Sequence, residues 1–247
     1  ITNSIEIKPN SEKMVVFTLG CARNERKFQD LIYHYSIVDN CLIELDMVKK
    51  KWDRLLGSIQ VKTSNPSLDY MLNGWYLYQA LSSRIMARAG FYQVSGAFGY
   101  RDQLQDAMNI CIVNPEFTKT QILINASHQF EQGDVLHWWH EANRFGLRSR
   151  YKDDYLWLVY ATIHYLDVTD DYSILDEMVP YIYGEELTQH EAERGISFNY
   201  TEKEDTLFNH CLLAINYSMS QIGIHGLPLM GGGDWNDGMN KVGIKGK

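Results

Sequence analysis

Several features that define common protein classes are scarce or missing in this sequence. Its four cysteines lie far apart and form no CxxC pair, so neither a zinc-binding motif nor a disulfide framework is predicted. No stretch approaches the roughly 18 consecutive apolar residues of a membrane span, and residues 1–10 are too polar for a secretory signal. The sequence therefore predicts a soluble protein of a reducing, cytoplasmic compartment.

Positive charge is also scarce. The net charge is −8, the pI is about 5.5, and no basic stripe extends beyond the short run at residues 49–51. A nucleic-acid partner is therefore not expected, because such surfaces require clustered Lys and Arg. The Gly-x-Ser-x-Gly, Walker A and dinucleotide-binding motifs are absent as well, so serine hydrolases, nucleotidases and dehydrogenases have no support. The chemistry that remains is that of Asp and Glu.

The length and the two ends suggest how the chain is organised. With 247 residues and 45% hydrophobic content, the chain is long enough for one large domain or two small ones. It begins at Ile1 without methionine and ends at Lys247 directly after its most motif-rich segment. We expect it to be part of a longer polypeptide, and we expect it to pack against the remainder of that polypeptide.

The apolar pattern predicts a mainly α-helical chain with a short β-rich leader. Strands are predicted at residues 4–8 and 13–19, and linker helices within 23–65. From residue 66 the pattern is all-α, with helices predicted at 66–89, 101–113, 115–131, 153–168, 172–178 and 204–222. Residues 133–150 are predicted as a long functional loop and 180–201 as a polar excursion.

The chemically densest segment is GGGDWNDGMN, residues 231–240. Its glycines permit positive φ and close approach of the backbone to a ligand. Trp235 offers a flat apolar surface for a sugar ring, and Asn236 offers hydrogen bonds to hydroxyls. Either Asp234 or Asp237 has the chemistry to protonate a glycosidic oxygen. A polar turn with a capping Asp is the alternative, and the residues alone do not choose between the two carboxylates.

A second group of candidates lies at the start of the helix predicted at 101–113. Arg101 and Asp102 follow a glycine-punctuated aromatic loop at residues 91–100, which contains the further sugar-binding candidate Gln93. A carboxylate at a helix N-terminus is often only a cap. The small residues of the loop favour a binding role, because they leave space for a ligand beside Arg101 and Asp102.

The third group is the sequence HWWH at residues 137–140. Two histidines three residues apart suggest a metal site, but no third ligand with suitable spacing follows, so no metal is predicted. Trp138 and Trp139 are predicted as surfaces for sugar rings, with His140 beside them.

A pair of arginines follows the HWWH sequence. Arg148 and Arg150 are suited to bidentate contacts with sugar hydroxyls or a phosphate. Structural ion pairs within this segment, with Asp153 and Asp154, are the competing interpretation.

Taken together and in order, these motifs resemble glycoside hydrolase family 94, the inverting phosphorylases of cellobiose, chitobiose and related β-glucosides. Within this family, the sequences of the motifs are most similar to those of the phosphorylase-like domain of cyclic β-1,2-glucan synthases and of 1,2-β-oligoglucan phosphorylases. The matching segments are Asn73-Gly74-Trp75 with Tyr78, Gln79 and Arg84, residues 90–93, 96–106, 137–140 and 225–230, Arg150 with Asp153, Asp154, Trp157 and Leu158, and residues 233–240.

The resemblance implies a fold and an assembly. Residues 1–22 would form the end of a β-sandwich, 23–65 linker helices, and 66–247 the first half of an (α/α)6 barrel. Members of the family often dimerise, so a homodimer is a further expectation. The chain would act in the cytoplasm, alone or as the cytoplasmic domain of a larger membrane-associated synthase.

The resemblance also implies a reaction. Asp237 would be the general acid, inorganic phosphate the nucleophile, and a β-glucan oligosaccharide the substrate, with no cofactor. Arg101 and Asp102 would bind the ring on the non-reducing side of the scissile bond, and Trp235 and Asn236 would shape the sugar site. Since the family's phosphate ligands would lie beyond Lys247, the chain alone is expected to be inactive.

Two alternatives stay open. The first is an inverting hydrolase on the same scaffold, with Asp153, Asp154 or a downstream Glu as the base that activates water. The second is a non-catalytic glucan-binding module that uses Trp138, Trp139 and Trp235 to hold sugar rings.

Overall fold

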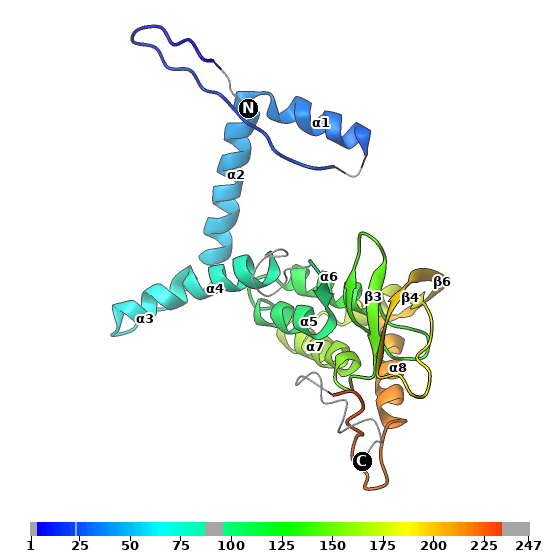
Figure 1. The fold of residues 1–247 in the computed structure, drawn as a ribbon. Coiled ribbons are helices and arrows are strands. Elements are labelled where there is room, and N and C mark those ends of the chain that lie inside the picture. Colours follow the sequence, from blue (N-terminus) through cyan, green and yellow to red (C-terminus); the bar gives the residue numbers. More distant parts are fainter. Residues whose placement is uncertain (1–3, 23, 87–95, 234–247) are drawn as a thin grey trace. The chain divides into compact units, whose positions relative to one another are not determined.

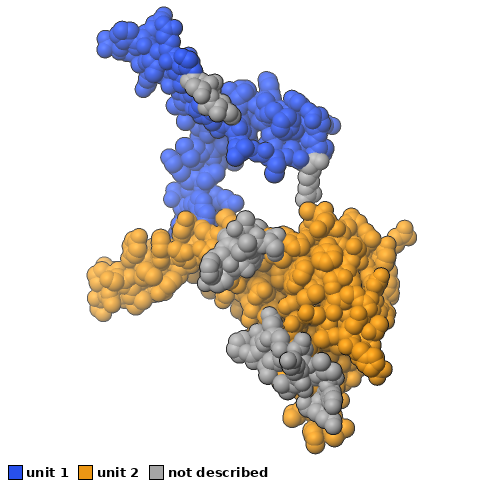
Figure 2. Space-filling view, in the orientation of Figure 1, with its two compact units in different colours: residues 1–58 blue, residues 59–247 orange. Residues whose placement is uncertain are grey.

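The computed structural model describes residues 4–22, 24–86 and 96–233, and about half of these residues are helical (Figure 1). The chain divides into two compact units, residues 1–58 and residues 59–247, coloured separately in Figure 2. Among the described residues, no helix combines the length and the apolar character that crossing a bilayer requires. Each unit is described by itself below.

The described part of the first unit contains two helices, as its apolar periodicity predicts. Helix α1 (Glu25–Tyr35) begins after Asn24, whose side chain accepts a hydrogen bond from the Lys27 backbone N–H, and helix α2 (Val38–Leu56) follows directly. Neither helix has a buried residue, although both carry large apolar side chains. The apolar faces of these helices are therefore uncovered within the described part of the unit.

The prediction of strands at residues 4–8 and 13–19 is wrong. Residues 4–22 make a hydrogen-bonded turn, in which Ser11 N–H donates to the Lys8 carbonyl, but they contain no strand. An isolated two-stranded ribbon is at best marginally stable in water, and the described part of this unit has no sheet on which to extend it.

The second unit opens with a helix broken by a sharp kink. It begins at Pro66 as predicted, with the Asn65 side chain as its cap, and consists of α3 (Pro66–Tyr70), η1 (Met71–Trp75), α4 (Tyr76–Gln79) and η2 (Ala80–Ile85). The kink lies at Asn73 and Gly74, where Gly74 has a φ of 124°. The Asn73 side chain accepts from Val61 N–H at 2.6 Å and donates to the Val61 carbonyl at 2.8 Å. The last part of the predicted helix, from residue 87, lies outside the described residues.

Four helices form the main layer of this unit, and all four are confirmed predictions. They are α5 (Tyr100–Asn109), α6 (Pro115–Ala126), α7 (Asp154–Thr169) and α8 (Leu207–Met219). Helix α7 packs against each of the other three (Figure 1). The core around it contains fully buried Leu104, Ile122, Leu158, Ala161 and Ala214. Between α7 and the strands that follow, the predicted short helix is a 3-10 turn, η3 (Tyr172–Asp176).

The expectation of an all-α chain after residue 65 is wrong. The described residues of the second unit contain six strands: β1 (Phe98–Gly99), β2 (Leu136–His140), β3 (Phe145–Ser149), β4 (Met178–Tyr183), β5 (Glu193–Ser197) and β6 (Asn199–Thr206). They form an antiparallel sheet of order β1-β2-β3-β5 and a separate antiparallel pair, β4-β6.

Two of the predicted irregular segments are therefore sheet, for different reasons. The predicted loop at 133–150 is largely the β2–β3 hairpin, whose register shifts between Leu136 and Trp138. Such an irregularity disturbs the period-two alternation that identifies a strand. The polar excursion at 180–201 includes parts of β4 and β6 and all of β5. Strand β6 (NYTEKEDT) has no apolar alternation to reveal it, and it forms by pairing with β4, where Val179 and Ile182 are buried.

Candidate functional site

The segment at residues 150–154, between β3 and α7, joins several of the sequence-predicted motifs. Gly232 N–H donates to the Arg150 carbonyl, and Lys152 N–H donates to the Gly233 carbonyl, both at 3.0 Å. These bonds form a short parallel bridge between Tyr151 and Gly233. The described end of the glycine-rich segment therefore lies directly against the residues that lead into α7.

The same segment also holds Arg101. Arg101 opens α5, is only 8% exposed, and donates from Nη1 to Asp153 Oδ2 at 3.1 Å. Trp157 Nε1, one turn into α7, donates to the same oxygen at 3.1 Å. The partner of Asp153 is thus Arg101, from another motif, and not one of the two arginines that precede Asp153 in the chain.

Asp102, next to Arg101, has an exposed side chain. A Cβ built on Gly99 would lie 2.3 Å from Asp102 Oδ2, so that position has room only for glycine while the carboxylate folds over it. The carboxylate stays at the N-terminal end of α5, where the helix dipole favours negative charge. Both the capping role and the binding role of Asp102 are compatible with this position.

Buried Asp154 and partly exposed His137 form a pair that the sequence did not predict. Asp154 is 3% exposed, and its Oδ2 lies 2.8 Å from His137 Nδ1 on β2. Burial raises the pKa of the Asp154 carboxyl above its ordinary value, and the hydrogen bond from His137 opposes that rise. The adjacent residues Asp153 and Asp154 therefore tie α7 to α5 and to β2.

The HWWH residues do not form one sugar-binding surface. Trp139 is 1% exposed, and its ring stacks on Phe98 at 5.7 Å and on His128 at 4.0 Å between centroids. The prediction that Trp139 holds a sugar ring is therefore wrong, because its ring is packed inside the core. Neighbouring residues of a strand face opposite sides of the sheet, so Trp138, which is only half-buried, remains available as a candidate.

His140, at the end of β2, lies beside Trp138. The two rings meet edge to face with centroids 5.5 Å apart, and both side chains are partly exposed. Trp138 and His140 share a face of the strand because they are two residues apart. These two side chains are therefore the pair of HWWH residues that stay candidates for contact with a sugar.

The two arginines after β2 support the chain between β4 and β5. Arg150 donates from Nε to the Glu191 carbonyl at 2.8 Å and from Nη2 to the Thr188 carbonyl at 2.9 Å. Arg148 is 3% exposed and donates to both carboxylate oxygens of Asp134, at 2.6 and 2.8 Å. For both arginines these contacts favour the structural interpretation over the substrate-binding one, with backbone carbonyls and Asp134 as partners.

Lys152 provides a pH-dependent contribution to stability. Its Nζ donates to Gln221 Oε1 at 2.8 Å, and burial, with the nearby Arg150, lowers its pKa from 10.5 to about 8. Below pH 8 the amine is charged in both the folded and the unfolded state, so folding bears the full cost of burying the charge. Above pH 10.5 it is neutral in both states, and that cost is gone.

We therefore expect the free energy of unfolding of the wild type, relative to Lys152→Met, to rise between about pH 8 and pH 10.5. The expected rise is on the order of 1–3 kcal/mol. Denaturant unfolding of both proteins across this range measures it, and taking the difference cancels the titration of groups that both share. A difference that does not change with pH would contradict a buried, charged Lys152.

Several predicted site residues lie outside the described residues. These are Gln93, Asp234, Trp235, Asn236 and Asp237. The described part of the glycine-rich segment ends at Gly233, which is hydrogen-bonded to Lys152. The roles of these five residues therefore stay predictions. His137 and Trp157 were part of the matching motifs, but sequence reasoning assigned neither of them a role in the site. Trp157 follows Asp153 by four residues, which places both on one face of α7, and this spacing was a usable signal.

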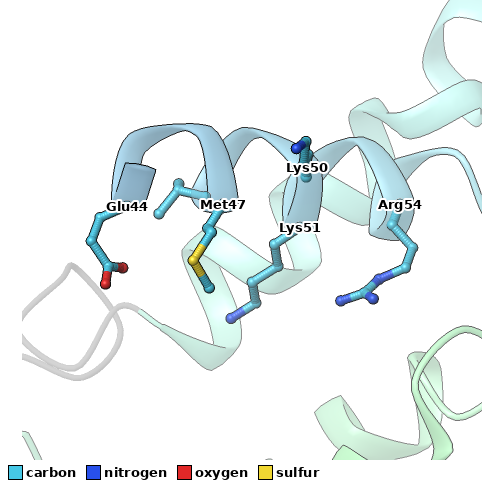
Figure 3. Close-up of a pocket in the computed structure, with 6 residues that line it drawn as sticks. Glu44, Met47, Lys50, Lys51 and Arg54 are labelled. Atoms are coloured by element: carbon cyan, nitrogen blue, oxygen red, sulfur yellow. The ribbon is translucent and has the colours of Figure 1, made fainter. Parts of the chain in front are cut away.

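The described chain has a hollow on helix α2, in the first unit. Its volume is about 440 Å³, and Figure 3 shows Met47, Lys51 and Arg54 extending from the same side of the helix. It is lined by Glu44, Met47, Val48, Lys50, Lys51 and Arg54. Ligand sites of enzymes are usually lined by side chains that converge from several elements, and all of these come from one helix. The hollow is therefore not a candidate substrate site.

Comparison with known proteins gives a consistent picture. Residues 51–246 match the family model of the glycosyl hydrolase 94 superfamily, catalytic domain. The chain is 38% identical over its whole length to the cyclic beta-(1,2)-glucan synthase NdvB of Rhizobium meliloti (strain 1021), of which it covers 9%. It is 28% identical over 95% of its length to N,N'-diacetylchitobiose phosphorylase of Vibrio proteolyticus, and 31% identical over 76% to solabiose phosphorylase of Paenibacillus borealis. The chain covers 30% and 21% of these two relatives.

Proposed function

Because the chain belongs to the glycosyl hydrolase 94 superfamily, we propose that it forms part of the catalytic domain of an inverting carbohydrate phosphorylase. The observation that carries the proposal is the position of residues 150–154. This segment contacts the glycine-rich segment at Gly232 and Gly233 and the Arg101 guanidinium through Asp153. The predicted acid-bearing motif and the predicted sugar-binding motif thus adjoin one short stretch of chain.

In the proposed reaction, an oxygen of inorganic phosphate attacks the anomeric carbon of a β-glucoside. The bond from this carbon to the glycosidic oxygen breaks, and Asp237 transfers its proton to the leaving oxygen. The products are a sugar 1-phosphate of inverted, α configuration and a shortened glucan. A second carboxylate is not needed as base, because phosphate is already an anionic nucleophile.

Arg101 and Asp102 are proposed to hold the sugar ring on the non-reducing side of the scissile bond. Arg101 is fixed at the start of α5, and a guanidinium group is suited to donating to several hydroxyls. Trp235, Asn236 and Asp234 would complete this site, with Trp138 and His140 as outlying contacts.

The proposed substrate is a β-1,2-linked glucan. This finer assignment is supported by the 38% identity to a protein named as a cyclic beta-(1,2)-glucan synthase, against 28% and 31% to phosphorylases named for chitobiose and solabiose. Identity of this size favours a shared linkage without fixing chain length. Inorganic phosphate is the co-substrate in this proposal, and no cofactor is required.

We further propose that residues 66–247 are half of an (α/α)6 barrel. Large apolar side chains are exposed in stripes at helical spacing along α7 (Leu156, Tyr160, Ile163) and along α8 (Phe208, Leu212, Ile215, Met219). Stripes of this kind are normally covered by further helices. The remaining helices of a longer polypeptide would supply the cover and the phosphate ligands, and the isolated chain would be inactive. A homodimer in the cytoplasm, or a domain of a membrane-associated synthase, belongs to the same proposal.

The test uses the full-length polypeptide that carries this chain. It is incubated with β-1,2-oligoglucan, cellobiose or N,N'-diacetylchitobiose, each with and without inorganic phosphate. We expect shortening of the β-1,2-oligoglucan only when phosphate is present. Reducing sugar released at the same rate without phosphate would indicate the hydrolase alternative. Saccharide binding without any turnover would indicate the glucan-binding module.

A further inference from the structure

The contact between Arg101 and Asp153 differs from the structural arginine pair in the same unit. Arg148 engages both oxygens of Asp134, and the two side chains are 4% and 9% exposed. Asp153 receives both Arg101 Nη1 and Trp157 Nε1 on one oxygen, Oδ2. Its other oxygen, Oδ1, is buried and has no hydrogen-bond partner among the described residues. The contact between Arg101 and Asp153 thus uses one carboxylate oxygen and leaves the other, which is buried, unsatisfied.

An unsatisfied buried oxygen is costly, so a purely structural pair would not be expected to keep it. The cost is increased by the neighbouring carboxylate Asp154, which is 3% exposed and whose Oδ1 also lacks a hydrogen-bond partner within the described part of the chain. Two adjacent carboxylates at the start of α7 nevertheless face Arg101 and His137. Buried polar groups kept at such a cost are typical of functional sites.

Asp153 is itself held in place from its own helix. The Trp157 indole, one turn later, fixes Oδ2 at 3.1 Å, so the carboxylate direction does not depend on Arg101 alone. The carboxylate in turn limits where the Arg101 guanidinium can lie. A long, flexible arginine loses side-chain entropy when it binds a ligand, and a partner that orients it beforehand reduces that loss.

We propose that Asp153 is a positioning residue, which orients the Arg101 guanidinium for binding the sugar ring, with Trp157 fixing the carboxylate. This inference rests on the proposed function, in which Arg101 binds the sugar. Asp153 acts through Arg101, so removing Asp153 should matter only while Arg101 is present. That dependence separates positioning from a general contribution to the fold.

The experiment is a double-mutant cycle in the full-length polypeptide, with Asp153→Asn, Arg101→Lys and the double variant. Asn keeps the shape and one acceptor oxygen but removes the charge. We expect Asp153→Asn to raise the KM for the glucan, and its Kd by calorimetry, about 10-fold, with the KM for phosphate unchanged. In the Arg101→Lys background the same substitution is expected to change both values less than about twofold.

Asp171→Asn is the matched control. Asp171 pairs with Lys119 of α6 at 3.3 Å, close to the opposite end of α7, and lies outside the proposed site. This substitution is expected to leave the glucan KM and Kd unchanged in both backgrounds. Thermal unfolding of every variant checks that the fold is intact.

Each outcome decides the inference. Equal effects of Asp153→Asn in both backgrounds, or no effect in the wild type, would overturn positioning while leaving phosphorolysis intact. If the wild type binds glucan without phosphorolysis, the proposed function fails, and the cycle of Kd values still decides the role of Asp153. If it neither binds nor cleaves glucan, both proposals fail.

Discussion

Replacing Asp237 by Asn in the full-length polypeptide is expected to lower kcat for phosphorolysis about 10²- to 10⁴-fold. An amide has nearly the same shape as a carboxylic acid but has no acidic proton to give the glycosidic oxygen. The Kd for the glucan is expected to change little, because the substitution keeps the volume of the side chain. Steady-state rates of sugar 1-phosphate release and calorimetric binding measure the two effects separately.

Two comparisons make this result specific to proton donation. A β-glucoside with a nitrophenolate leaving group needs little protonation, so its phosphorolysis should suffer much less from Asp237→Asn than that of the glucan. The matched variant Asp234→Asn is expected to impair binding more than kcat. A large loss of kcat in Asp234→Asn, with Asp237→Asn nearly fully active, would reverse the assignment of the general acid.

Replacing Asp134 by Ala is expected to lower the free energy of unfolding by about 3–5 kcal/mol, because it leaves the Arg148 guanidinium charged and unpaired in the interior. Arg148 lies 3.7 Å above the centroid of the Phe130 ring and also donates to the Glu185 carbonyl at 3.2 Å. These contacts hold the guanidinium in the interior. Urea unfolding measures the loss.

The control for this prediction is an exposed ion pair in the same unit. Lys203 and Glu131 lie 2.8 Å apart with side chains that are 58% and 41% exposed. Glu131→Gln is expected to cost less than about 1 kcal/mol, as exposed pairs usually do. If Asp134→Ala costs no more than Glu131→Gln, the Arg148–Asp134 pair is not a main support of the β4–β5 connection.

The helices of the second unit were predictable because their signals are local. Pro115 follows the capping residue Asn114, and α7 carries Asp154 in its first turn. Residues close in sequence therefore mark the N-terminus of each helix. Their ends were less accurate, since a predicted end at residue 131 became Ala126 in the structure. Helix ends depend on packing as well as on local preference.

The strands were not predictable for the opposite reason. Strand β6 is polar along most of its length and is defined by its partner β4, about 20 residues earlier in the chain. Strand β2 has a register shift that hides its alternation. Pairing partners of this kind are a property of the whole fold, and a single sequence does not display them.

The candidate site shows the same division. The residue types at Arg101 and Asp153 were visible in the sequence, but not their contact, which joins residues 52 positions apart. The sequence does not distinguish Trp138 from Trp139. Only the strand geometry shows which ring is buried and which is partly exposed. Chemistry was therefore easier to predict than the partners that organise it.

The most direct test of inverting phosphorolysis follows the products by ³¹P and ¹H nuclear magnetic resonance. The full-length polypeptide is mixed with β-1,2-oligoglucan and inorganic phosphate, and the first turnovers are observed. The proposed mechanism predicts α-glucose 1-phosphate, formed in equal amount to the phosphate consumed and to the glucosyl units lost. Free glucose formed with the phosphate signal unchanged, or a β-1-phosphate, would contradict it.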